Sequence, residues 1–227
     1  MKKTLAILSS LTVAAAFAGN VDPGNEFGFV PVTGKTGLKA VSVPLAGYSV
    51  GDPTRIKISE ILQTGGLAAD DKLYTLGSDG KYSEYTLQGD GTWKASRVVT
   101  VDVNGNMVAA SGTPATEATL ARGQAFWLDT QATQVCLMGQ ATTDQPAVTL
   151  STGWNLVGSS SMTRATRICD IAGKAGDFLN VNGKTYQYSQ TKGWFDRSTR
   201  NPVSKEEIDN GNPDIIPVGI GAMLRHQ

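Results

Sequence analysis

Short segments with apolar residues at alternate positions recur along this chain, and each follows a turn glycine. Residues 37–43 (GLKAVSV) and residues 153–159 (GWNLVGS) are two such segments. A period of two predicts strands that bury one face, because successive side chains on a strand point to opposite sides. The pattern therefore predicts the same kind of strand near the start of each half.

The elements that follow come in the same order in both halves. Residues 57–62 and 167–172 place apolar side chains at i, i+3 and i+4, which predicts one face of a short helix. Asp79-Gly80 and Asn182-Gly183 come next along the chain. Such pairs favour tight hairpins in which both turn residues have positive φ.

Tyrosine-containing strands, a glycine-tryptophan step and a closing strand complete each half. These segments are residues 82–85, 91–93 and 120–128 in the first half and residues 186–188, 193–194 and 216–224 in the second. Several matches in one order predict an internal duplication. We therefore expect a mainly β protein of two tandem, similar antiparallel domains, each a small sandwich or barrel-like unit with one short helix.

The duplication sets the expected boundaries of the two units. We place the first β-rich unit at residues 27–140 and the second at residues 141–227. The first unit carries an extra predicted hairpin from Arg97 to Ala110, with Asn104-Gly105 at its tip.

The succession of strands and turns also resembles one known type of module. The first copy opens with Phe27-Gly28-Phe29-Val30 and ends with Leu137-Met138-Gly139, after its Gly-Trp step and its Leu-x-x-Gly-x-x-Phe-Trp strand. This pattern is similar to a duplicated module of secreted bacterial proteins of unassigned function. The second copy departs from it at Ala222-Met223, where those modules prefer paired aromatic residues. The resemblance implies a β-rich fold and an extracytoplasmic setting, and it carries over no catalytic residue.

The N-terminus has the three parts of a secretory signal peptide. Lys2 and Lys3 precede an apolar run from Leu5 to Phe17, and small residues at Ala16 and Ala18 follow the pattern that signal peptidase recognises. The run is shorter than the roughly 20 residues that span a bilayer. We expect a signal peptide at residues 1–18, a flexible leader at 19–26, and export to the periplasm, the cell surface or the medium.

The charge balance excludes some classes of partner. The chain has 20 basic and 20 acidic side chains, and because Lys2 and Lys3 would leave with the signal peptide, 18 basic residues would remain against 20 acidic ones. A dedicated nucleic-acid binder usually presents a basic face, so no nucleic-acid partner is expected. Nothing in the mature chain has the length and apolarity of a transmembrane segment.

The two cysteines allow two interpretations. Cys136 and Cys169 meet an oxidising compartment if the chain is exported, which favours a disulfide that staples the two halves together. The alternative is two buried thiols that pack as small apolar groups.

The sequence contains little that predicts catalysis or metal binding. His226 is the single histidine and lies beside the C-terminus, where it is expected to be a polar chain end. Asp70-Asp71 and Glu206-Glu207 are the acid pairs that could serve glycan hydrolysis, although adjacent acids usually lie on the solvated surface. The loops around Asp102 and Asp209 lack the spacing of a calcium-binding loop. We expect no enzyme, no metal and no cofactor.

Aromatic residues are the remaining lead to a ligand. The four tryptophans and several tyrosines could stack on sugar rings, and Trp93, Trp194, Tyr85 and Tyr188 are the first candidates. The alternative is that aromatic residues at repeat-equivalent positions fill equivalent cores. That alternative is favoured for Trp93 and Trp194, because they occupy matching places in the repeat.

These observations lead to an ordered set of functional hypotheses. The first is a secreted or cell-envelope structural or adhesive protein that associates with itself or with other envelope proteins. Its self-assembly strand would contain Phe27, Phe29, Val30 and Val32, because an apolar strand near a terminus can pair with a neighbouring sheet edge. The second is a carbohydrate-binding module, and the third is an acid-pair glycan hydrolase.

Overall fold

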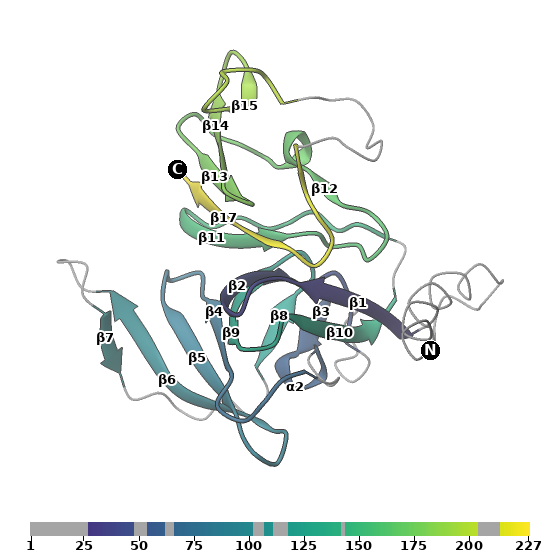
Figure 1. Cartoon of the computed structure of the whole chain (residues 1–227). Coiled ribbons are helices and arrows are strands. Elements are labelled where there is room, and N and C mark those ends of the chain that lie inside the picture. Colours follow the sequence, from purple (N-terminus) through teal and green to yellow (C-terminus); the bar gives the residue numbers. More distant parts are fainter. Residues whose placement is uncertain are drawn as a thin grey trace, which may run out of the picture.

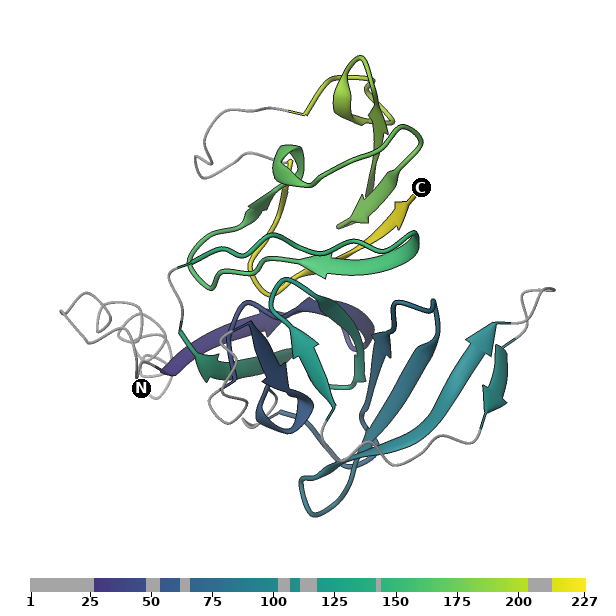
Figure 2. The same cartoon turned by 180° about the vertical axis from the view of Figure 1, so that it is seen from behind.

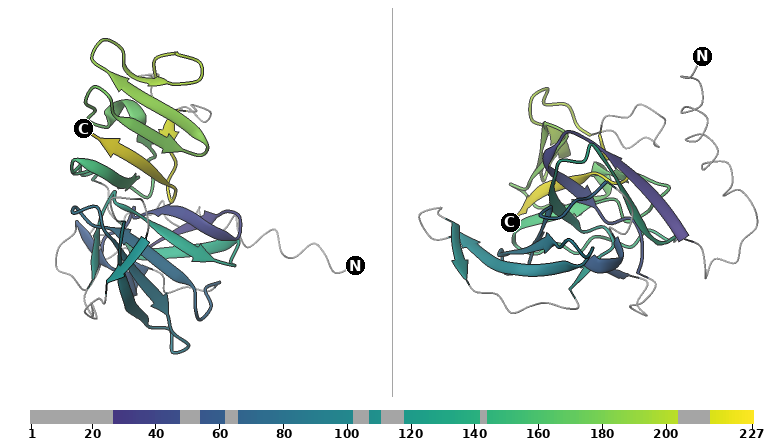
Figure 3. Two further views of the ribbon diagram at one scale, coloured as in Figure 1. Left: turned by 90° about the vertical axis from the view of Figure 1, so that its left-hand side faces the viewer. Right: turned by 60° about the horizontal axis from the view of Figure 1, so that its bottom comes forward.

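A computed structural model of the chain gives the fold. It describes residues 27–47, 54–61, 66–101, 107–110, 118–141, 144–203 and 214–227. The predicted signal peptide, the leader, the tip at Asn104-Gly105 and the pair Glu206-Glu207 therefore lie outside the described residues. Two β-rich units stack one above the other, the second above the first in Figure 1 and in the left view of Figure 3.

The first unit is built on a six-stranded antiparallel sheet. Its strands are β2 (Gly37–Ser42), β4 (Lys72–Leu76), β5 (Tyr82–Leu87), β6 (Trp93–Val101), β7 (Met107–Ala110) and β9 (Ala125–Thr130). Their order in the sheet is β2-β9-β4-β5-β6-β7. The β6–β7 hairpin is the extra hairpin predicted for this half, and it lies at the margin of the unit in Figure 2.

Two short ribbons and one helical turn complete the first unit. The ribbons are β1 (Phe27–Thr33) with β10 (Gln134–Gln140) and β3 (Arg55–Lys57) with β8 (Thr119–Ala121), and the helical turn is α2 (Ile58–Ile61). Val30 and Leu137 from the outer ribbon meet Leu73, Phe126 and Leu128 from the sheet in one buried cluster. Burial of such side chains contributes roughly 1.5–3 kcal/mol each to the stability of the unit.

The second unit repeats this plan with a five-stranded sheet. Its elements are β11 (Gly153–Gly158), β12 (Thr166–Arg167), the 3-10 turn η1 (Ile168–Asp170), β13 (Phe178–Val181), β14 (Lys184–Ser189), β15 (Gly193–Asp196), β16 (Ile215–Ile216) and β17 (Gly221–His226). The sheet order is β11-β17-β13-β14-β15, and β12 pairs with β16.

The two sheets have the same topology and the same register. The order β2-β9-β4-β5-β6 matches β11-β17-β13-β14-β15 strand for strand, and β3-β8 matches β12-β16. Gly37 pairs with Thr130 in the first unit as Gly153 pairs with His226 in the second. The predicted fold class is therefore confirmed: the protein is mainly β, with two similar antiparallel units and one short helical turn in each.

The two predicted hairpin turns differ in conformation. Asn182 and Gly183 both have positive φ (48° and 77°), as predicted for a two-residue turn. In the pair Asp79-Gly80 of the first unit, Gly80 has a positive φ (76°) and Asp79 does not, so the prediction for Asp79 was wrong. The reason is a longer loop between β4 and β5, in which the Gly77 N–H donates to the Lys81 carbonyl oxygen at 2.8 Å.

The units meet through corresponding residues, with an approximate two-fold relation. The Ser42 N–H donates to the Gly219 carbonyl oxygen at 3.2 Å, and the Gly158 N–H donates to the Gly123 carbonyl oxygen at 2.8 Å. The strand registers make Ser42 the counterpart of Gly158, and Gly123 the counterpart of Gly219. The same hydrogen bond therefore forms twice, once with the donor in the first unit and once with the donor in the second. This symmetry creates equivalent hollows on the two flanks of the interface.

Candidate functional site

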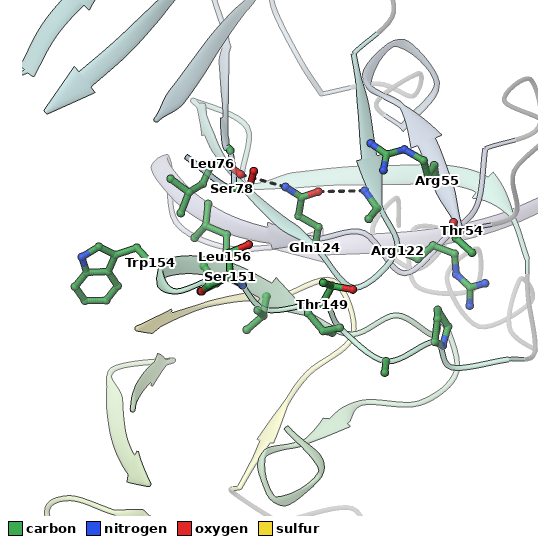
Figure 4. Close-up of a pocket in the computed structure, with 17 residues that line it drawn as sticks. Thr54, Arg55, Leu76, Ser78, Arg122, Gln124, Thr149, Ser151, Trp154 and Leu156 are labelled. Carbon is green, nitrogen blue, oxygen red and sulfur yellow. Dashed lines mark hydrogen bonds between the residues drawn. The ribbon is translucent and has the colours of Figure 1, made fainter. Parts of the chain in front are cut away.

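A cleft of about 600 Å³ opens on one flank of the interface between the units (Figure 4). The first unit supplies the turn after β4 together with Arg55, Arg122 and Gln124. The second unit supplies residues 146–149, Ser151 and the first part of β11. The volume falls within the roughly 300–1,000 Å³ of small-ligand sites.

Trp154 is the large apolar side chain at one end of this cleft. It lies on β11 and is 46% exposed, although tryptophan is usually well covered. Leu156, two residues further along the strand, is buried with Leu76 and Ala125 between the units. The buried Leu156 anchors the strand, and Figure 4 shows the Trp154 ring extending away from the other lining side chains. An exposed indole beside a polar cleft is a surface on which a sugar ring can stack.

The walls of the cleft are polar and held in place by hydrogen bonds. Gln124 accepts from the Ala121 N–H at 3.1 Å and donates to the Leu76 carbonyl oxygen at 3.4 Å, as the dashed lines in Figure 4 show. Asn155 accepts from the Ser151 N–H at 2.9 Å and donates to the Ser151 carbonyl oxygen at 2.7 Å. These bonds fix the walls before any ligand binds, which lowers the entropy cost of binding.

Hydroxyl groups in the lining are available to a ligand. Within the described part of the chain, the hydroxyl groups of Ser78, Thr149 and Ser151 form no hydrogen bond. A hydroxyl group can donate one hydrogen bond and accept two, which suits the hydroxyl groups of sugars.

Arg122 forms the floor at the other end of the cleft. Its side chain is fully buried, and its Nη1 donates to Asp144 Oδ1 at 2.9 Å while its Nη2 donates to the Ser160 carbonyl oxygen at 2.9 Å. The guanidinium therefore ties the first unit to two segments of the second unit. Sequence reasoning missed this residue, because nothing in its local pattern shows which backbone oxygens it reaches.

A second, smaller hollow of about 390 Å³ lies on the opposite flank. Leu38, Trp127 and Met223 are among its lining residues. Leu38 is the counterpart of Trp154 in the first unit and is 60% exposed. The two hollows are thus related by the approximate two-fold, but only the larger one has an aromatic side chain at this exposed position.

The four aromatic residues predicted as stacking platforms lie in or against the cores. Tyr85 and Trp194 are buried, and Trp194 Nε1 donates to the Ile171 carbonyl oxygen at 2.9 Å. Trp93 packs against the first core, and Tyr188 meets Trp194 edge to face with ring centroids 5.5 Å apart. The platform prediction was wrong for Tyr85 and Trp194, because stacking on a sugar requires an open ring face.

The described acid pair does not form two opposed carboxylates. Asp71 is buried and accepts from Thr130 Oγ1 at 2.7 Å and from the Ala68 N–H at 2.9 Å. Asp70 is exposed and has a φ of 74° in the same turn. This geometry gives Asp71 a structural role in holding the turn before β4.

His226 is not the poorly ordered chain end expected from its position. It belongs to β17, and its Nδ1 lies 2.8 Å from Oδ2 of the fully buried Asp177. Asp177 is the counterpart of Asp71, and His226 is the counterpart of Thr130. Both units therefore use a buried aspartate to fasten the end of their closing strand.

The predicted disulfide is not formed in this structure. Cys136 lies on β10 in the first unit and Cys169 in η1 of the second, and both carry thiols. Cys136 Sγ lies 3.8 Å from the Leu137 carbonyl oxygen, and Cys169 Sγ lies 3.7 Å from Asp170 Oδ1. Among the described residues there is also no group of three side chains that could hold a metal ion.

Thiol labelling without reductant tests the state of these cysteines. In denaturant, iodoacetamide is expected to alkylate both Cys136 and Cys169, and intact mass would count the added groups. In the folded protein, Cys169 should react slowly at neutral pH and should need a higher pH than an ordinary thiol to react fast, because burial raises the pKa of its thiol and the thiolate is the nucleophile. A Cys136→Ser variant isolates this rate. Alkylation in denaturant that required prior reduction would show that the bridge exists.

The predicted self-assembly strand is used within the first unit. β1 pairs with β10 from Phe27 to Thr33, and Val30 and Val32 are buried in the core. Phe29 faces outward and is 42% exposed. Self-association through this strand stays a prediction, and one edge of the strand is already occupied by β10.

Comparisons with protein-family models, with curated proteins and with solved structures found no match to this chain. In the part of the chain that the structure describes, no helix has the length and apolarity needed to cross a bilayer. The geometry of the cleft is therefore the basis for a functional proposal.

Proposed function

We propose that this chain is an exported, non-catalytic adhesion protein that attaches to a glycan through the Trp154 cleft. The observation that carries the proposal is the 46% exposed Trp154 at the end of a cleft with polar, pre-positioned walls. An apolar platform combined with hydroxyl and amide groups matches the two faces of a sugar, which has an apolar ring surface and a polar edge. The predicted signal peptide at residues 1–18 supports export.

The same lining favours binding over hydrolysis. Glycoside hydrolysis uses a pair of carboxyl groups on either side of the scissile bond. Among the described lining residues of this cleft there is no aspartate or glutamate. A ligand in this cleft would therefore be held without an acid-base pair to cleave it.

A substitution at Trp154 tests the proposal. Trp154→Ala should weaken binding to glycans that the wild type captures on a broad array by roughly tenfold, because it removes a stacking contact of about 0.5–1.5 kcal/mol together with the apolar area that the ring buries. Titration calorimetry on the best array ligand would measure the loss.

The two-fold relation supplies a matched control for this test. Leu38→Ala removes the equally placed exposed side chain of the first unit and should leave glycan binding unchanged. No capture of any glycan by the wild type, or an equal loss in both variants, would reject the Trp154 cleft as the binding site.

A further inference from the structure

The charged side chains that line the Trp154 cleft are all basic in the described part of the chain. Arg55 and Arg122 line it, and no aspartate or glutamate does. The whole chain has equal numbers of acidic and basic residues, 20 of each. A lining with cations alone is therefore a local enrichment in positive charge, and it favours anionic ligands.

The two arginines differ in how far their charge is compensated. Arg122 is paired with Asp144 at 2.9 Å, so its charge is largely neutralised within the protein. Arg55 is exposed, and its guanidinium bonds go to Thr119, with Nε 2.8 Å from the hydroxyl oxygen and Nη2 3.5 Å from the carbonyl oxygen. It forms no ion pair with any described residue. A guanidinium has five N–H donors, so Arg55 keeps donors for a ligand.

The two hollows differ in their cations. Among the described residues, the smaller hollow is lined by Lys39, whose Nζ donates to the Ala132 carbonyl oxygen at 2.6 Å, and by no arginine. The β3–β8 and β12–β16 registers make Ala165 the counterpart of Arg55, and Val218 the counterpart of Arg122. Leu38 takes the place of Trp154 in the same comparison. The stacking ring and the unpaired Arg55 therefore belong to the same flank, which favours one ligand that uses both.

We infer that the Trp154 cleft takes an acidic sugar chain, in which one ring stacks on Trp154 while a carboxylate or sulfate group binds Arg55. Figure 4 places Trp154 and Arg55 at opposite ends of the cleft. The anionic group would therefore belong to a different sugar unit from the ring that stacks on Trp154. Arg binds carboxylate and sulfate oxygens through charge-assisted hydrogen bonds, which are stronger than neutral ones. This inference rests on the proposed glycan-binding function.

A pair of probes that differ only in charge tests the inference. Oligogalacturonate carries a carboxylate on each ring, and its methyl ester has the same sugar backbone without the charge. The wild type should bind the acid up to about fivefold more tightly than the ester, because a single solvent-exposed charge pair makes only a modest contribution to binding. A sulfated oligosaccharide and its desulfated form make a second pair, which identifies the anionic group.

Two substitutions assign the charge effect to the cleft. Arg55→Gln should reduce the preference for the acid to about twofold and flatten its dependence on salt concentration, since the anion then meets no unpaired cation. Arg200→Gln removes one exposed positive charge from the loop after β15 and should leave the preference intact. Thermal unfolding of both variants would confirm that they fold.

The outcomes separate this inference from the proposed function. Equal binding of acid and neutral forms in both probe pairs, with a loss in Trp154→Ala, would overturn the acidic ligand and leave glycan binding in place. A preference for the acid that survives in Arg55→Gln would also overturn it. Failure of the wild type to bind any acidic or neutral glycan would overturn both. A preference for either acid that is lost in Arg55→Gln would support it.

Discussion

Replacing Gly158 by alanine is expected to destabilise the protein by about 2–3 kcal/mol, although only one methyl group is added. A Cβ at position 158 would overlap the Cβ of Ser42 and would also come within 3.1 Å of the Ile220 carbonyl oxygen. The Ser42 Cβ is attached directly to the backbone, so it cannot rotate away. The strain must therefore move one unit relative to the other, and urea denaturation should report it as a lower midpoint.

A double-mutant cycle makes this prediction specific. Ser42→Gly in the Gly158→Ala background should restore most of the lost stability, because it removes the clashing atom. Ser42→Gly alone should cost at most about 1 kcal/mol, since Ser42 Oγ is buried without a hydrogen-bond partner and only backbone entropy is lost. Gly89→Ala is the matched control, because nothing lies within 4 Å of a Cβ there. Additive effects of the two interface substitutions would contradict the proposed contact.

The same geometry explains why the two copies differ where they meet. Ser42 and Gly158 are counterparts, and they face each other across the approximate two-fold. Ala125 and Gly221 form a second such pair, in which a Cβ on Gly221 would lie 2.8 Å from the Ala125 Cβ. Two side chains on the axis would collide, so one member of each pair is glycine. Tight packing at a symmetry axis thus accounts for divergence between the copies.

Much of the fold follows from the sequence because it depends on local patterns. Turn glycines such as Gly37 and Gly153 have φ of 89° and 100°, a region that side-chain-bearing residues rarely adopt, so their positions mark the strand starts. Alternating apolar residues and the repeated order of strands then fix two similar sheets. The contact between the sheets was not predictable in this way, because it is formed by small residues and backbone groups that show no pattern.

The candidate site was harder to predict, because it combines residues from both units. The sequence suggested Trp93 and Trp194 as stacking residues, but they occupy equivalent positions of the repeat and pack in or against equivalent cores. Trp154 instead aligns with Leu38, so the two copies do not share an aromatic residue there. An aromatic residue without an aromatic counterpart was the signal that could have identified it. Arg55 and Arg122 gave no comparable signal, since only the assembled units bring them to one cleft.

Loss of the Asp177 carboxylate is the second large effect that the structure predicts. Asp177 is fully buried and accepts hydrogen bonds from the Lys174 N–H and the Gln227 N–H, both at 2.8 Å, and its Oδ2 lies 2.8 Å from His226 Nδ1. Asp177→Ala would leave these part-buried groups without their partner. We expect a loss of about 2–3 kcal/mol in the free energy of unfolding, measured by urea denaturation, because an unsatisfied donor costs about 1–3 kcal/mol when buried and less where water reaches it.

Conservative changes separate the carboxylate from the space that it fills. Asp177→Asn keeps the shape but turns one acceptor into a donor, so it should cost about half as much as alanine. His226→Ala should cost less still, because both backbone N–H groups keep their acceptor. Asp71→Ala in the first unit removes a carboxylate that accepts from two donors, the Ala68 N–H and Thr130 Oγ1. Its loss of stability should fall between those of Asp177→Ala and His226→Ala. Asp177→Ala with a stability within about 1 kcal/mol of wild type would show that the closing strand is held by its sheet pairing alone.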